Sequence, residues 1–280
     1  MRANLAASHL AKRLNARYQN PIMTATIQSI YRYPVKGLTP ESLPRAEITP
    51  GRTLPADRLY AIENGPSGFD PAAPAYLPKQ RFLMLMRNER LASLTTRYLD
   101  ASRTLSIMQN GREAARGDLA TPQGRAAIEQ FLAHYCEDEL RGPPKILHAQ
   151  GHSFSDVAAK VVSIINLASV AAIENAVGVP VDPLRFRGNI YVGGWPAWHE
   201  FGQLGQTIGS GGARLKIVKR IVRCAATDVE PGTGIRDLQI PRTLMQAFGH
   251  TDCGVYAKVT AAGTIAPGDA IVETGQSSLW

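Results

Sequence analysis

Short runs that alternate apolar and polar residues dominate this sequence, and turns rich in glycine and proline separate them. Alternation with a period of two is typical of β-strands that bury one face, whereas amphipathic helices repeat their apolar residues at a longer period. Residues 24–38 alternate in this way, and further strand-like runs lie at 104–111, 159–166 and 207–229. The last run predicts a strand, a glycine turn and a long second strand. Many short strands with few helices predict β-barrel-like domains with added helices.

Helical patterns are few. Residues 121–135 begin with Thr-Pro and place apolar residues at i, i+3, i+4 and i+7, which predicts an amphipathic helix. A second helix is predicted with Ser169 as its N-cap and Gly178 at its end. We also predict a strand at 82–88 and a β-hairpin at 254–274.

The length of 280 residues suits one large or two smaller domains. A Gly-Pro-Pro stretch marks a seam between a first part at 23–142 and a second part at 143–275. The predicted fold class is α+β, mainly β: an N-terminal β-barrel-like domain, then a second β-barrel domain with peripheral helices. Residues 1–22 contain basic but no acidic side chains. We interpret them as a flexible tail, and a transit-peptide composition is the alternative.

The charge balance indicates an anionic partner. The chain has 31 Lys and Arg against 23 Asp and Glu, a net charge of +8. This suits nucleic acid, a membrane surface or a phosphorylated small molecule. The arginines are scattered singly, which favours a phosphate-bearing ligand and predicts no nucleic acid partner. No stretch of about 18 apolar residues is present, so no membrane span is predicted.

The three cysteines, Cys136, Cys224 and Cys253, cannot all pair in a disulfide framework. A reducing compartment is the simplest setting, and we expect a cytoplasmic protein. The sequence has no C-x-x-C or C-x-x-H pair, so a zinc site is not expected. Cys136 lies beside the apolar face of a predicted helix and is interpreted as packing. Cys253 follows Asp252, whose charge would raise the pKa of a thiol, so we interpret Cys253 as structural.

Four separate segments place a cation or a cysteine at the end or start of a predicted strand. Lys36 precedes Gly37, Arg58 begins a strand, Arg187 precedes a glycine, and Cys224 follows a long strand. Cations beside glycine let the backbone approach an anionic ligand closely. A cysteine near several cations would be a good soft metal ligand or nucleophile. Spacing alone leaves the alternative that the arginines are structural and that Cys224 is a small buried hydrophobe.

These segments, in this order, resemble the MOSC family of molybdenum cofactor proteins, and more narrowly its amidoxime-reducing branch, the mitochondrial amidoxime-reducing components and their bacterial relatives. "IYRYPVKGL" and "DRLYAIEN" resemble the N-terminal β-barrel domain of that family, expected here at 23–142. "HSFSD", "RFRGNIYV", "RIVRCAATDVEPGTG" and "HTDCGVYAKV" resemble the MOSC domain, expected at 143–275. The cysteine-containing segment is the most specific element, and the resemblance covers roughly 25–273.

The resemblance implies a molybdenum–molybdopterin cofactor in which the pterin supplies a dithiolene and one protein cysteine completes the thiolate ligation. Cys224 matches that cysteine, which makes it the implied metal ligand and catalytic residue. Lys36, Gly37 and Arg58 match the phosphate and pterin end. At Gly37 relatives can carry a hydroxyl, so only a backbone amide could donate here. The implied cofactor-binding residues are Lys36, Gly37, Arg58, Asp156, Arg187, Arg223, Cys224 and Tyr256.

The implied activity is reduction of small N-hydroxylated substrates such as amidoximes, hydroxylamines or hydroxylated bases, with Asp156 as one possible general acid. The sequence has no flavin (FAD), NAD or iron–sulfur signature, so a separate electron-transfer protein is expected as a partner. The alternative is a molybdenum cofactor carrier or sulfur-handling protein without its own turnover. A pyridoxal-phosphate-binding desulfurase domain would support that alternative, and none is evident. A weaker third hypothesis is a basic nucleic-acid-binding protein.

Overall fold

The largest sheet of the protein closes into a seven-stranded barrel. The computed structural model describes residues 25–274, so the predicted tail at 1–22 lies outside the described residues. Around the barrel the strand order is β1-β10-β9-β13-β12-β11-β15, and β15 pairs again with β1. These strands are β1 (Ala25–Arg32), β9 (Val162–Asn166), β10 (Ile190–Gly193), β11 (Thr207–Ser210), β12 (Ala213–Val222), β13 (Asp252–Ala261) and β15 (Ala270–Thr274).

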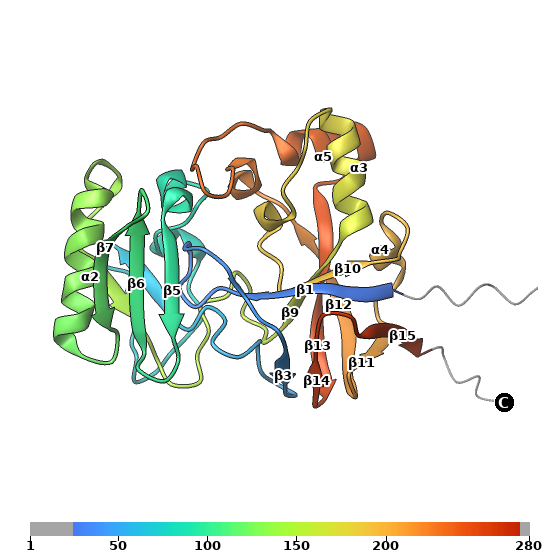
Figure 1. The fold of residues 1–280 in the computed structure, drawn as a ribbon, viewed down its shortest axis with the longest axis horizontal. Helices are drawn as coiled ribbons and strands as arrows, with labels where there is room; N and C mark the ends of the chain where they lie inside the picture. The colour runs from blue at the N-terminus through green and yellow to red at the C-terminus, as the bar shows by residue number, and fades with distance from the viewer. Residues whose placement is uncertain (1–24, 275–280) are drawn as a thin grey trace, which may run out of the picture.

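The first strand of the described chain belongs to this barrel (Figure 1). In β1, Ile27 pairs with Val192 of β10, and Ala25 pairs with Ile271 of β15. The short strand β2 (Glu41–Ser42) extends β1, and β3 (Ala46–Ile48) pairs with β14 (Gly263–Ile265). N-terminal residues therefore contribute to the core of the C-terminal part. The division at 142/143 stays a prediction.

A second body lies beside the barrel (Figure 1). It contains the antiparallel sheet β5-β6-β7 and the pair β4-β8. Helix α2 packs on β7 so closely that a Cβ at Gly117 would lie 2.0 Å from the carbonyl oxygen of Gly124. Only glycine permits that approach. The elements of this body are β4 (Ala61–Asn64), β5 (Thr95–Leu99), β6 (Thr104–Gln109), β7 (Arg112–Asp118), α2 (Pro122–Tyr135) and β8 (Pro144–Leu147).

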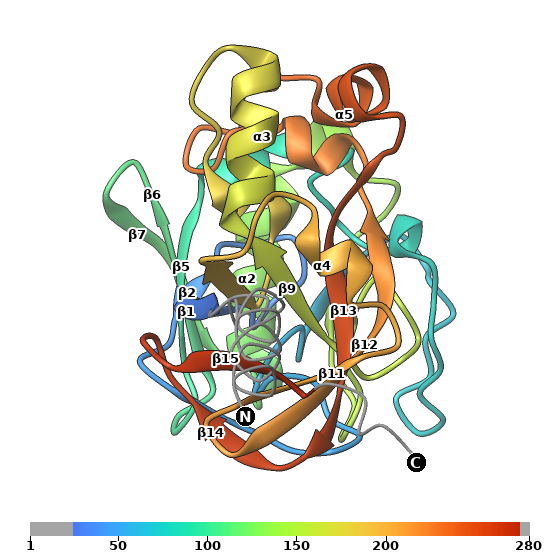
Figure 2. The same ribbon diagram turned by 90° about the vertical axis from the view of Figure 1, so that its right-hand side faces the viewer.

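Helices α3 (Leu167–Val177) and α5 (Ile240–Phe248) cover one end of the barrel, and the short α4 (His199–Gly202) lies beside it (Figure 2). Helix α3 ends at Gly178 in the left-handed region, as predicted. Its N-cap, however, is Asn166, whose side chain accepts from the Ala168 N–H. Ser169 lies inside the helix and donates to Glu200, so the predicted cap is wrong.

The predicted mainly β fold with a barrel and few helices is confirmed. Two further local predictions are wrong. Residues 82–88 form no strand: Phe82 makes one isolated bridge to Glu63, and residues 85–87 form a turn that the Asn88 side chain closes by accepting from the Met84 N–H. Residues 254–274 form no hairpin, because β13 pairs with β9 and β12 while β15 pairs with β11 and β1. No helix of the described chain is long and apolar enough to cross a bilayer.

Short 3₁₀ segments connect these elements and shape the cavity described below. They are η1 (Lys79–Arg81), η2 (Glu89–Ser93), η3 (Glu137–Glu139), η4 (Pro183–Phe186) and η5 (Ala225–Asp228). Segment η4 precedes β10 and η5 follows β12, whereas η1 belongs to the other body. Cys136 and Cys253 are both fully buried in hydrophobic clusters, which confirms the packing predicted for them.

Candidate functional site

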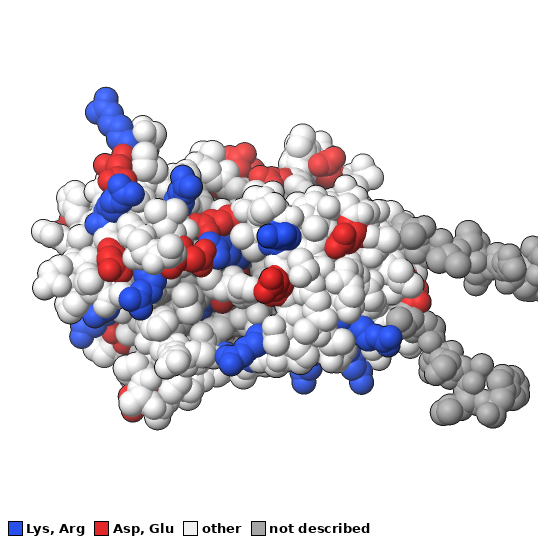
Figure 3. Space-filling view, turned by 60° about the horizontal axis from the view of Figure 1, so that its bottom comes forward, with Lys and Arg blue, Asp and Glu red and all other residues white. Residues whose placement is uncertain are grey.

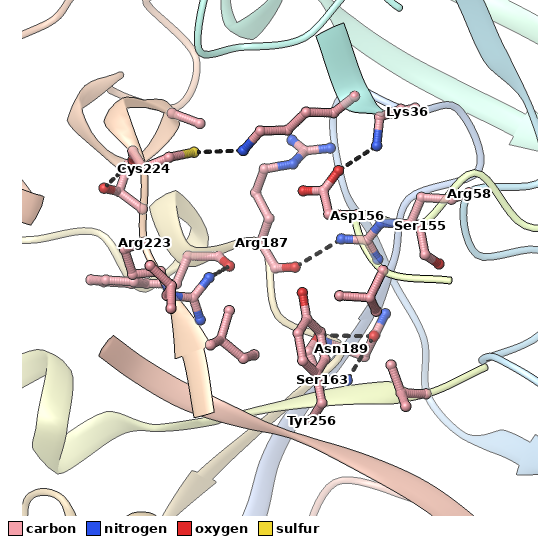
Figure 4. A pocket seen from close by; sticks show the side chains of 18 of the residues that line it. Lys36, Arg58, Ser155, Asp156, Ser163, Arg187, Asn189, Arg223, Cys224 and Tyr256 are labelled. Atoms are coloured by element: carbon pink, nitrogen blue, oxygen red, sulfur yellow. Dashed lines mark hydrogen bonds and ion pairs between the residues drawn. The ribbon is translucent and has the colours of Figure 1, made fainter. Parts of the chain in front are cut away.

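A cavity of about 340 Å³ lies where the two bodies meet, and side chains from both line it. Figure 4 shows the labelled members around one open space. Among the described residues that line it are eight lysines and arginines but only two aspartates. The structure brings together all of the predicted site residues except Gly37. They are Lys36, Arg58, Asp156, Arg187, Arg223, Cys224 and Tyr256.

Lys36 and Asp156 form an ion pair at one side of the cavity. The Lys36 ammonium donates to Asp156 Oδ1 and, across 2.9 Å, to the carbonyl oxygen of Phe154. Burial lowers the pKa of Lys36, and the Asp156 charge opposes that shift. Burial opposes ionisation of Asp156, but the charges of Lys36, Lys79 and Arg58 outweigh it and hold its pKa well below the usual range. Asp156 is therefore a carboxylate at neutral pH, an acceptor rather than a proton donor.

Arg58 and Arg187 both lie over the ring of Tyr33. The guanidinium carbons are 4.4 Å and 4.3 Å from the ring centroid, within the range of a cation–π contact. Asp57 holds Arg58 through a hydrogen bond of 2.7 Å and accepts the Tyr33 N–H across 2.8 Å. Arg58 in turn donates to the carbonyl oxygen of Arg187 across 3.0 Å. Tyr33, fully buried, thus supports two of the cations that face the cavity.

Arg187 differs from Arg58 in having no carboxylate at hand. Its guanidinium donates to the carbonyl oxygen of Leu38 across 2.8 Å, and no carboxylate of residues 25–274 lies within ion-pair distance. Burial lowers the pKa of Arg187, and the charge of Arg58 adds to the shift. An anion bound in the cavity would relieve both effects. Arg187 is accordingly a buried cavity cation without a carboxylate partner among residues 25–274.

Cys224 lies at the end of β12, where the chain turns into η5. Its carbonyl oxygen accepts from the backbone N–H and the hydroxyl of Thr227, both across 3.0 Å, which fixes the turn. Its sulfur accepts a hydrogen bond of 3.2 Å from the Lys79 ammonium. Burial alone would lower the pKa of Lys79, but the negative charges of Cys224 and Asp156 raise it. The sulfur therefore faces the cavity beside a cation from the other body.

Arg223 and Tyr256 line the cavity in different ways. Arg223 donates to the carbonyl oxygens of Cys253 and Phe186, each across 2.8 Å, so most of its donors tie β13 to η4. Tyr256 stands on β13, and Figure 4 shows it below the centre of the cavity. Burial raises the pKa of Tyr256, and so does the Asp156 charge. Its hydroxyl thus stays protonated and can donate to a ligand.

Gly37 is the predicted site residue that the structure does not bring to the cavity. Its φ is +85°, and a Cβ there would lie 3.1 Å from the Leu83 carbonyl oxygen. It lines a small neighbouring pocket of about 30 Å³. Glycine is required at this position by the turn after Lys36 and not by contact with the cavity.

Sequence reasoning missed Lys79, Tyr33 and Asp57. Lys79 is separated from Cys224 by 145 positions, and nothing in its local sequence marks a functional residue. Asp57 directly precedes Arg58, and this adjacency was the one available signal of a paired cation. Among the described residues, no group of three or more His, Cys, Asp or Glu side chains could hold a metal ion. Cys224 could thus serve as a metal ligand only if a bound group supplied the others.

Comparison with known proteins identifies two family matches that together span most of the chain. The MOSC N-terminal beta barrel domain matches residues 24–142, and the MOSC domain matches residues 149–272. No curated protein matches this sequence.

Solved structures resemble the chain only distantly. The YuaD protein from Bacillus subtilis is 14% identical with a TM-score of 0.43, covering 89% of this chain and 94% of that one. YiiM from Geobacillus stearothermophilus is 21% identical with a TM-score of 0.33, covering 42% and 55%. At these values neither likeness carries an argument. The two domain matches show that the chain belongs to the MOSC family, with a MOSC N-terminal beta barrel domain followed by a MOSC domain.

Proposed function

We propose that this protein is a molybdenum cofactor-dependent oxidoreductase that reduces N-hydroxylated compounds with electrons from a separate carrier protein. MOSC domains are generally molybdenum cofactor-binding domains, associated with sulfurase-like proteins and oxidoreductases. The observation that carries the proposal is the sharing of one cavity by the Cys224 sulfur and a surplus of cations from both bodies.

The cavity fits a molybdopterin group by its donor set. Arg187 has no carboxylate partner among residues 25–274, and an anionic phosphate would supply the missing charge. Arg58 is oriented by Asp57 and lies, together with Arg187, over the ring of Tyr33. A thiolate from Cys224 is a soft ligand suited to a metal whose other sulfur ligands come from the pterin. Lys36, Arg58 and Arg187 would hold the cofactor, and Cys224 would bind the metal.

When bound, the cofactor would supply the two-electron redox couple that side chains lack. The residues of the chain then bind and orient. Lys79 donates a hydrogen bond to the Cys224 sulfur, and Arg223 ties the Cys253 and Phe186 carbonyl groups together. Tyr256 keeps its proton and can donate a hydrogen bond, whereas the ionised Asp156 can only accept one. We therefore drop the general-acid role for Asp156.

The proposed reaction is a two-electron reduction of the substrate. An amidoxime takes up two electrons and two protons, its N–O bond breaks, and an amidine and water are formed. The electrons come from a carrier protein in one-electron steps.

The test uses protein produced in a host that makes molybdenum cofactor, purified and assayed for metal. Loaded protein is incubated with benzamidoxime and either NADH alone or dithionite-reduced methyl viologen. The proposal predicts benzamidine only with reduced viologen. Turnover with NADH alone would contradict the need for a separate carrier. Full loading with no turnover under either condition would favour the cofactor carrier instead, and absence of molybdenum would overturn both.

A further inference from the structure

The outer face of the barrel carries a row of cations on two neighbouring strands. On β12, Arg214, Lys216 and Lys219 are exposed, and on β13 so is Lys258. We call these four residues the basic ladder. A bulge between Ile217 and Lys219 turns Lys219 outward, although strict alternation would not. In Figure 3, Lys and Arg side chains gather along the lower edge of the barrel half, while most Asp and Glu lie above them.

Two members of the ladder face each other directly. Lys216 pairs with Lys258 in the register of β12 and β13, so both ammonium groups leave the same face of the sheet side by side. Like charges at directly opposed positions destabilise a sheet. No carboxylate of residues 25–274 lies within ion-pair distance of any ladder residue. The fold therefore keeps two opposed ammonium groups with no carboxylate of the described residues to neutralise them. A negatively charged partner would supply that charge.

The ladder leads to the cavity. Lys219, Arg220 and Val222 line the cavity, and Cys224, which also lines it, follows two residues after Val222. Val218 and Val222 expose 38% and 65% of their surface among the cations. These two apolar side chains would add apolar contacts to the charged ones in an interface with another protein. A phosphate backbone would use the cations and leave both valines without contacts, so the composition favours a protein over nucleic acid.

We propose that the basic ladder docks an acidic one-electron carrier protein and sets its redox centre against the mouth of the cavity beside Cys224. The electron-transfer role rests on the proposed function, whereas the docking of an acidic protein rests on the surface alone. Two reduced carriers each give up one electron for every N–O bond broken, and the docked carrier is released oxidised. Opposite charges would mainly speed the encounter and fix its orientation.

The decisive variant is Lys216→Glu. It replaces the repulsive pair with Glu opposite Lys258, so the melting temperature should rise while docking weakens. Lys216→Glu combined with Lys258→Glu should weaken docking further. The matched control is Arg97→Glu, which reverses an exposed cation on β5 of the other body. None of these positions lines the cavity, so turnover with reduced viologen should stay at the parent rate.

Binding is measured by calorimetry with an acidic [2Fe–2S] ferredoxin as the probe, without turnover, at about 20 mM and about 300 mM salt. We expect binding that weakens with salt, a loss of about tenfold or more in the double variant, and no change in Arg97→Glu. Parent protein that does not bind the probe, or a double variant that binds it equally well, would overturn the docking surface. Duplex DNA that binds more tightly and displaces the ferredoxin would overturn it in favour of nucleic acid. Docking without viologen-driven turnover would instead refute the proposed reductase.

Discussion

The Lys79 ammonium donates a hydrogen bond of 3.2 Å to the Cys224 sulfur, and these two residues come from different bodies of the protein. This contact places a cation directly beside the sulfur that faces the cavity. It also explains why the pKa of Lys79 is raised although burial works against it. The contact makes the one cysteine in the cavity chemically distinct from the other two.

Thiol labelling of the native protein should therefore modify one cysteine. Burial raises the pKa of Cys136 to about 12, and the nearby Glu139 adds to the shift. Burial raises the pKa of Cys253 to about 12 as well. Iodoacetamide at neutral pH should alkylate Cys224 alone, and Lys79→Met should slow that reaction. Peptide mass spectrometry measures both results, and labelling of all three thiols at similar rates would contradict the burial argument.

Loss of Arg187 or of Lys36 should lower cofactor content. Arg187→Ala and Lys36→Ala each remove a charge-assisted contact worth about 1.5–3 kcal/mol, so the variants should lose most of their molybdopterin during purification. Pterin fluorescence after oxidation measures the content. Arg97→Ala, exposed on β5, is the control and should stay loaded. Variants that are loaded as fully as the parent would show that these cations do not hold the cofactor.

Tyr33 should act through its ring. Tyr33→Phe keeps the surface on which Arg58 and Arg187 lie, whereas Tyr33→Leu removes it. Each cation–π contact contributes about 0.5–2 kcal/mol, so Tyr33→Leu should bind cofactor more weakly than Tyr33→Phe. The melting temperatures of both cofactor-free variants are measured first, to show that each is folded as stably as the parent. Their cofactor contents are then compared. Equal loss in the two variants would contradict a role of the ring.

Acidification should weaken the fold through Asp156. Because the folded-state pKa of this carboxyl lies below its unfolded value, the stability it contributes is present above about pH 5 and is lost as pH falls through the folded pKa. Asp156→Asn should remove this component, so its melting temperature should depend less on pH between about 5 and 3. Calorimetric scans of parent and variant test this, and parallel pH curves would contradict it.

Local sequence was sufficient to predict β1, β6, β9, β11 and β12. Strands β1, β6, β11 and β12 alternate because each buries one face, whereas β9 is a short apolar run that is buried throughout. Local sequence was not sufficient to predict which strands pair. Strands β13 and β15 do not pair with each other, because β13 pairs with β12 and β15 pairs with β11. The Ser169 cap was wrong because Asn166 lies one turn earlier and caps the helix first.

The predicted site followed the motifs that carry the family resemblance, and seven of its residues meet in one cavity. Lys79 and Tyr33 could not be predicted, because their roles depend on contacts between distant segments. Gly37 was placed in the site by its position after Lys36, but its backbone conformation turns it toward Leu83. Motifs identify which residues carry chemistry, and the fold decides which neighbours support them.

Cys224→Ser is the sharpest test of Cys224 as the metal ligand. The variant keeps the size of the side chain and the cations that hold the pterin, but it lacks the soft thiolate. Parent and variant are produced together, pterin and molybdenum are quantified, and benzamidoxime reduction with reduced methyl viologen is measured. The account predicts a folded variant that retains most of its pterin and has no detectable turnover. A variant that reduces benzamidoxime at the parent rate would contradict the assignment of Cys224 as the metal ligand.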